Sequence, residues 1–158
     1  MIFNHIPALT VQEDAELRLL RVRWSGGRSP QPYREALAGF VESARESGAT
    51  RLLLELEDFP DMPVFDQLWL STALWQRASY LHARQVVVML SARRVYNRHV
   101  VESLLTQLQA QIRTDVQFFA QAEPALDWLT DNSPRVPALL DEWQQALPQS
   151  HDPLALAR

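Results

Sequence analysis

Short apolar runs that alternate with longer stretches of helical periodicity constrain the fold of this chain more than any other feature. Leu52-Leu53-Leu54 and Val86-Val87-Val88-Met89-Leu90 are uninterrupted runs of strand length, and the second is rich in β-branched residues. Between and after these runs, apolar residues recur at the three- and four-residue spacing of an amphipathic helix. Strands that alternate with helices usually pair in parallel, so the pattern predicts an α/β domain with covered inner strands.

The N-terminal part of the chain predicts an antiparallel pair instead. Residues 1–11 favour a strand interrupted by Pro7, and residues 12–16 form a polar connection suited to a hairpin. Residues 17–24 then alternate between apolar and arginine side chains, which is typical of a strand with one buried and one wet face.

The complete order of elements predicts the architecture. Helices are expected over residues 30–47, 64–82, 93–112 and 123–131, and further strands over 51–57, 86–90 and 116–119. This order predicts a mixed sheet of about five strands, with an antiparallel N-terminal pair, parallel inner strands and helices packed on it.

The residues after Ser133 predict a C-terminal extension. Four prolines divide this tail, and only residues 138–147 have the pattern of a short amphipathic helix. Its apolar stripe is expected to dock on its own domain or on a second copy of the chain, because burying large apolar side chains stabilises a contact. We therefore expect two parts, a domain over residues 1–133 and an extension over residues 134–158.

Composition narrows the class of protein. The 158 residues carry a net charge of -4, which argues against a nucleic-acid-binding protein, since phosphate contacts need a basic surface. The chain has no cysteine, and all of its basic residues are arginine, so thiol and lysine chemistry are excluded. No apolar window is long enough for a signal peptide or a membrane span, and we expect a cytoplasmic protein.

The helix expected over residues 64–82 is the main candidate for an interaction surface. Apolar residues lie almost all round it, so it either packs on two sides or leaves an exposed patch of the kind that marks association surfaces. We expect Phe65, Trp69 and Trp75, together with Trp143 of the tail, to be the anchors, because large aromatic residues dominate interface energies. Core packing alone would also explain these aromatic residues.

A second candidate site is a cluster of arginines. Arg93, Arg94 and Arg98 open the helix over residues 93–112, and a helix N-terminus attracts anions. Surface ion pairs with the carboxylates of residues 57–61 would explain the same arginines, and they remain the alternative.

Other chemistry has little support in the sequence. The four histidines have no metal-ligand spacing, and the aspartates of residues 58–66 fit a solvated connector better than a metal loop. No Gly-x-Ser-x-Gly motif or phosphate loop is present. We expect no catalytic residue, no metal and no cofactor.

Several segments in this order resemble the STAS/SpoIIAA-like domain family over about residues 8–131. The similar segments are Val22-Arg23-Trp24-Ser25-Gly26, Tyr33-Arg34-Glu35-Ala36-Leu37, Leu53-Leu54-Glu55-Leu56-Glu57-Asp58 and Glu123-Pro124-Ala125-Leu126-Asp127-Trp128-Leu129. The resemblance implies a non-enzymatic role in protein interaction or ligand sensing. The switch serine of the family's anti-sigma antagonists has no counterpart, because residues 58–66 contain no serine or threonine.

Three functions remain open. The first is a non-catalytic, STAS-like regulatory module that self-associates, for instance as a homodimer, or docks a protein partner through the apolar helix. The second is a carrier of a small apolar or lipid-like ligand, by analogy with lipid-binding domains of the same fold class. The third is an enzyme that holds an anionic substrate on the arginine cluster, with Asp58 or Asp61 as base.

Overall fold

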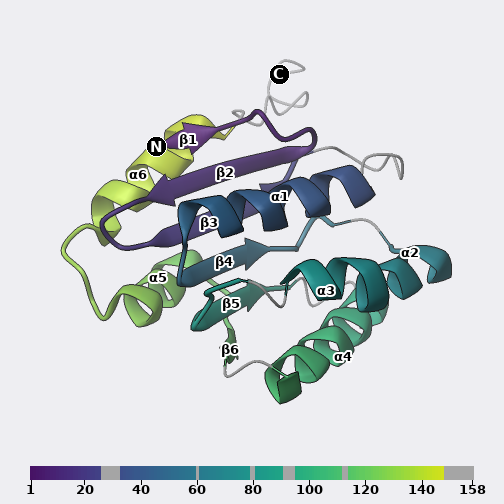
Figure 1. Cartoon of the computed structure of the whole chain (residues 1–158). Coiled ribbons are helices and arrows are strands. Elements are labelled where there is room, and N and C mark those ends of the chain that lie inside the picture. The colour runs from purple at the N-terminus through teal and green to yellow at the C-terminus, as the bar shows by residue number, and fades with distance from the viewer. Residues whose placement is uncertain (26–32, 60, 79–80, 91–94, 112–113, 148–158) are drawn as a thin grey trace, which may run out of the picture.

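Six strands form one sheet, and their spatial order is the order of the sequence. The computed structural model describes residues 1–25, 33–59, 61–78, 81–90, 95–111 and 114–147 (Figure 1). The strands are β1 (Ile2–Phe3), β2 (Leu9–Asp14), β3 (Leu19–Trp24), β4 (Arg51–Glu55), β5 (Gln85–Met89) and β6 (Asp115–Phe118). Strands β1 to β3 pair antiparallel and β3 to β6 pair parallel, which confirms the predicted mixed sheet.

Helices cover both faces of the sheet. They are α1 (Tyr33–Ser47), α2 (Val64–Trp69), the π-helical turn η1 (Leu70–Leu74), α3 (Trp75–Ala78), α4 (Val95–Gln111), α5 (Ala122–Thr130) and α6 (Val136–Ala146). Figure 1 shows α1 crossing in front of the sheet, with α3 and α4 at its lower right, and α5 and α6 behind it. The predicted tail helix therefore docks on its own domain, where it contacts α5 and β1.

Alternation of side chains along the inner strands produces two apolar layers. Leu52, Val86 and Val88 face α1 and belong to the larger buried cluster. Leu53 and Val87 point to the opposite face and join the smaller cluster under α5. Because neighbouring residues of a strand point to opposite faces, a strand buried on both sides must be continuously apolar, as β4 and β5 nearly are.

The expected hairpin connection over residues 12–16 begins too early. Strand β2 continues through Asp14, because Gln12 and Asp14 are buried on the face that α6 covers. The turn that follows is stabilised by the Asp14 carboxylate, whose Oδ1 accepts the backbone N–H of Leu17 at 3.0 Å. The short strand β1 is a further addition, and it makes the sheet one strand wider than expected.

The helix expected over residues 64–82 differs in the structure. Its middle is the π-helical turn η1, and Leu81 and His82 lie outside any helix; residues 79 and 80 lie outside the described residues. Ser71 Oγ and Thr72 Oγ1 donate to the carbonyl of Leu68 at 3.1 and 2.8 Å. Such back-bonding competes with regular helical hydrogen bonds.

The Asp14 carboxylate joins the β2–β3 turn to α6. Arg135 at the start of α6 places Nη2 2.7 Å and Nε 2.9 Å from Asp14 Oδ2. Burial by itself would raise the pKa of Asp14, but the Leu17 N–H and the Arg135 guanidinium outweigh that effect and hold the pKa below its usual value. The ionised form is therefore the one that stabilises the fold.

We expect Asp14→Asn to lower the free energy of unfolding at pH 7 by about 1–3 kcal/mol, the usual cost of losing hydrogen bonds to a buried charged group. A lowered pKa contributes stability above the unfolded pKa, about 3.9, that is lost as pH falls through the folded pKa. The difference between Asp14→Asn and the parent should therefore shrink in acid. Urea unfolding at pH 7 and pH 3 measures it, with Glu13→Gln as the neighbouring control. An equal difference at both pH values would contradict the assignment.

Candidate functional site

An apolar cavity of about 200 Å³ lies between the sheet and the helices on the α1 side. Its floor is formed by side chains of the inner strands, among them Val22, Leu52 and Val86. Its walls come from α1 (Leu37, Phe40 and Val41), from the segment 56–62 (Leu56, Phe59 and Met62) and from α4 (Val101 and Leu104). Its cover comes from the segment 64–78, which contributes Leu70, Leu74 and Ala78.

Polar groups at the cavity are few, and both polar residues that border it have partners elsewhere. Thr114 Oγ1 donates to the carbonyl of Ala83 at 2.9 Å. Glu55 accepts from Arg21 Nη2 at 2.6 Å, and Arg21 in turn lies against Trp143 of α6, on the opposite face of the sheet. Among the described residues, no cationic side chain lines this cavity. An apolar cavity of on the order of 150 Å³ stays dry and can hold a small apolar molecule.

The segment 58–63 contributes to this site, which the sequence interpretation missed. The sequence predicts a solvated acidic connector here, but Phe59 and Met62 are buried and line the cavity. The ring of Phe59 packs edge-on against Trp24, with ring centroids 5.2 Å apart. The signal in the sequence was two large apolar residues among aspartates and prolines, where a wet connector needs none.

The acidic residues of the same segment are held apart. Asp58 pairs with Arg23 at 2.9 Å, Asp66 pairs with Arg34 at 2.8 Å, and Asp61 is exposed. Burial, followed by the nearby carboxylates of Glu55 and Asp58, raises the pKa of Glu57. Within the described residues, no three acidic or histidine side chains come together in a group that could hold a metal ion.

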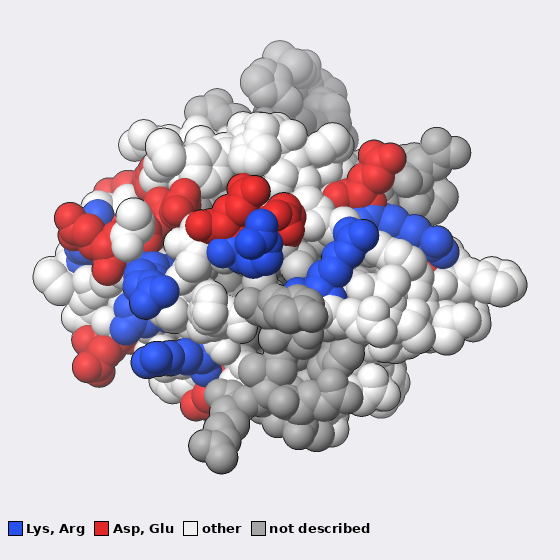
Figure 2. Space-filling view, in the orientation of Figure 1, with Lys and Arg blue, Asp and Glu red and all other residues white. Residues whose placement is uncertain are grey.

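The cover of the cavity has a second apolar side that faces solvent. Val64, Phe65 and Leu68 of α2 are 71%, 78% and 61% exposed, and no residue of α2 is buried. Figure 2 shows few charged side chains at the right-hand end of the molecule, where Figure 1 places α2. The segment 64–78 therefore has one apolar side on the cavity and another in water, as a helix that is apolar all round requires.

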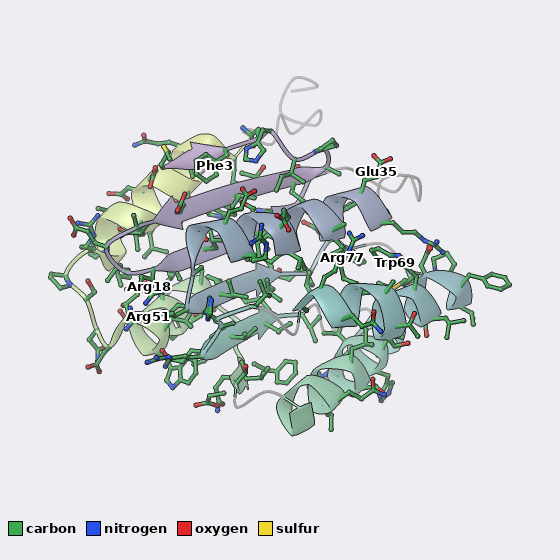
Figure 3. The ribbon with its side chains drawn as sticks, in the orientation of Figure 1. Phe3, Arg18, Glu35, Arg51, Trp69 and Arg77 are labelled. Atoms are coloured by element: carbon green, nitrogen blue, oxygen red, sulfur yellow. The ribbon has the colours of Figure 1, made fainter. Side chains whose placement is uncertain are left out.

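A small set of contacts ties α2 to its neighbours. Arg34 of α1 donates from Nε to Asp66 Oδ1, and its guanidinium carbon lies 5.5 Å from the centre of the Trp69 ring. Trp69 is half-buried on the side of α2 nearest α1 (Figure 3). Gln67 Nε2 also donates to the carbonyl of Met62 at 3.0 Å. Exposed ion pairs and cation–π contacts are weak, so the cover is lightly attached.

The remaining predicted site residues are scattered. Phe65 is exposed, whereas Trp143 is 3% exposed and packs on its own sheet. The side chain of Trp75 lies outside those that the structure describes. Arg98 is exposed and pairs with Glu102 of its own helix at 2.9 Å, while Arg93 and Arg94 lie outside the described residues. The predicted pairing of Arg98 with the carboxylates of residues 57–61 is not what the described residues show.

The histidines have no common site. His5, His82 and His99 are exposed on separate elements, and His151 lies outside the described residues.

Among the helices that the structure describes, none has both the length and the apolar character needed to cross a bilayer.

Comparison with known proteins supports the fold assignment. Residues 19–130 match the family model described as SpoIIAA-like, and this range runs from β3 to the end of α5. The chain belongs to the SpoIIAA-like family. No curated protein and no solved structure matched the chain. Of the described residues that line the cavity, all but Leu9 lie within the matched range.

We expect Arg34→Met to loosen the cover of the cavity while leaving the sheet intact. Removing an exposed ion pair and a cation–π contact should speed hydrogen exchange of residues 64–74 by roughly fivefold, because each contact is worth about 0.2–1 kcal/mol. Arg45→Met, which removes the exposed pair with Glu42 at the other end of α1, is the matched control. Unchanged exchange in this segment, or equal acceleration in β4 and β5, would refute the attachment.

Proposed function

We propose that this chain is a non-catalytic SpoIIAA-like module that binds a small, uncharged apolar ligand in the cavity between the sheet and the segment 64–78. The observation that carries the proposal is the apolar cavity of about 200 Å³. Interiors normally pack with few voids larger than a water molecule, and this partly open hollow leaves apolar side chains without packing contacts that a ligand would supply.

The lining supports an uncharged ligand over a fatty acid. A buried carboxylate needs a cationic or hydrogen-bonding partner, and the described lining residues provide no cation. Thr114 already donates its hydroxyl proton to Ala83, and the Glu55 carboxylate is already paired with Arg21 on the opposite face of the sheet. The ligand class is therefore a neutral aliphatic or aromatic molecule.

Entry to the cavity is consistent with the lightly attached cover. Leu70, Leu74 and Ala78 face the cavity from a segment that contains a π-helical turn, and π-helical turns often occur at functional sites. Movement of this segment would open the cavity without separating any pair of strands in the sheet.

We expect the neutral dye N-phenyl-1-naphthylamine to bind in this cavity, and Ala78→Phe to weaken binding by roughly tenfold or more, because the added ring occupies the ligand's space. Ala73→Phe is the matched control, since Ala73 lies in the same segment but is exposed. Fluorescence titration gives both dissociation constants. A naphthyl dye that carries a carboxylate should bind more weakly than the neutral dye.

Native mass spectrometry of freshly purified protein provides an independent measurement. A ligand carrier should retain a small neutral mass, and Ala78→Phe should lose it. If the neutral dye does not bind, or if both phenylalanine variants behave alike, the cavity is not a ligand site and the proposal is wrong.

A second candidate function rests on the exposed side of α2. Val64, Phe65 and Leu68 are spaced so that they lie close together on one side of the helix, and three large exposed apolar residues are typical of an association surface. Self-association or docking of a protein partner through this side would agree with the interaction role expected from the sequence. It does not compete with ligand binding, because the two functions use opposite sides of the same segment.

We expect Phe65→Ser to reduce self-association if a second copy binds to this side, because the substitution removes an aromatic ring that is 78% exposed and does not line the cavity. Light scattering over a range of concentrations measures the effect, and Phe118→Ser, at an exposed phenylalanine of the edge strand β6, is the control. A parent that remains monomeric, with both variants indistinguishable from it, would remove self-association from the proposal.

A further inference from the structure

The two helices behind the sheet cover surfaces of different character. Helix α5 packs on apolar side chains of the inner strands, including Leu53 and Val87. Helix α6, with Arg135 just before it, instead contacts buried polar side chains of β2 and β3, namely Gln12, Asp14 and Arg21. Together with Thr10 of β2 and with Glu55 of β4, which pairs with Arg21, these side chains form what we call the polar strip. All five are buried.

Three residues of the polar strip lie next to one another across the sheet, although the register pairs Glu55 with Arg23 and the contact with Arg21 is diagonal. Gln12 of β2 is directly opposite Arg21 of β3, and Arg21 reaches Glu55 of β4 with an Nη2–Oε1 distance of 2.6 Å. Trp143 of α6 covers Arg21, whose guanidinium carbon lies 4.3 Å from the centre of the ring. The Trp143 ring thus covers the Arg21 guanidinium on the α6 side.

This burial leaves polar atoms without partners. Among the described residues, Gln12 Oε1, Arg21 Nε, Arg21 Nη1 and Glu55 Oε2 are buried and accept or donate no hydrogen bond. Buried polar atoms without partners lose their hydration and gain nothing in return. A buried ion pair with incomplete hydrogen bonding is a weak source of stability. Docking of α6 therefore has a free-energy cost, because it removes water from the polar strip.

Other contacts hold α6 in place. Val136, Leu139 and Trp143 are buried, and Gln12 Nε2 donates to the Leu139 carbonyl and to Glu142 Oε2, both at 2.9 Å. Val136 and Leu139 join the apolar cluster that contains α5, and the partly buried Leu140 packs against it. The C-terminal part of the helix, around Trp143, rests on the polar strip.

The connection between α5 and α6 is a short turn. Asp131 and Asn132 follow α5 with φ angles of 55° and 56°, in the left-handed region that aspartate and asparagine tolerate better than most residues other than glycine. Both are exposed, and the connection ends at Arg135. Helix α6 lies outside residues 19–130, which match the family model.

We propose that α6 detaches from the sheet as a unit, pivoting on residues 131–135, and that hydration of the polar strip stabilises the open form. Detachment exposes mainly polar side chains of the sheet, together with the apolar stripe of α6. The closed form therefore conceals Trp143, and the open form displays it. This device does not depend on a ligand in the cavity on the other face.

Hydrogen exchange of the full chain tests the proposal directly. Amides of α6 should exchange faster than those of β4 and β5 by more than a hundredfold, because local opening requires less free energy than global unfolding. Replacing the buried pair by apolar side chains, Arg21→Met with Glu55→Met, should slow exchange of α6 by roughly tenfold or more, since such replacements are often stabilising. Equal exchange of α6 and the inner strands in the parent protein would overturn the proposal.

The matched control removes an exposed ion pair from the same part of the sheet. Arg23→Met with Asp58→Met changes the same charges two residues further along β3, where the pair is open to solvent. It should leave exchange of α6 unchanged. If the control slows α6 as much as the buried replacement does, the polar strip is not the cause of opening.

Thiol labelling provides a second test that does not require the double variant to fold. The chain has no cysteine, so Leu139→Cys in α6 and Leu129→Cys in α5 each introduce one buried thiol from the same apolar cluster. A thiol reagent should modify Leu139→Cys at least tenfold faster than Leu129→Cys, because only the former is uncovered by local opening. Equal rates would mean that both helices open only with the whole domain, which would contradict the proposal.

Discussion

The parallel pairing of β4 with β3 and β5 is the constraint on which the rest of the structure depends. Once Leu52 pairs with Leu20 and Val86, every second residue of these strands faces α1 and every other one faces α5. The two apolar layers follow from this single register, since a shift by one residue would exchange the faces of all these side chains. The cavity lies on one side of the register, and the buried Arg21–Glu55 pair lies on the other.

The cavity exists because its cover is apolar on two sides and cannot bury both. The segment 64–78 places Leu70 and Leu74 over the sheet and leaves Val64, Phe65 and Leu68 in water. A π-helical turn changes the direction of side chains within one short segment, so the apolar residues do not form one continuous stripe. Ligand binding on the inner side and association on the outer side are the two uses of this arrangement that we propose.

On the opposite face of the sheet, the side chains under α5 and those under α6 differ in polarity. Under α5 the sheet is apolar and closely packed, whereas under α6 it carries Gln12, Arg21 and Glu55 with several polar atoms unpaired. Because the hydrophobic contribution of Trp143 is opposed by the desolvation of Arg21, the attachment of α6 is a balance of two large terms. That balance makes α6 the part of this face best suited to move.

The sequence alone determined the class of fold and the order of its elements. The runs at residues 52–54 and 86–90 could be recognised as strands because apolar periodicity is a local property. The resemblance to the SpoIIAA-like family was likewise visible in short segments, among them residues 53–58 and 123–129. Only the tertiary structure decided that Phe59 and Met62 line a cavity, that Gln12 and Asp14 are buried, and that Arg21 is paired with Glu55. The reason is that periodicity reports which face of an element is apolar, whereas burial of a polar residue depends on the element that packs against it. For Gln12 that element is α6, which lies more than a hundred residues away in the sequence.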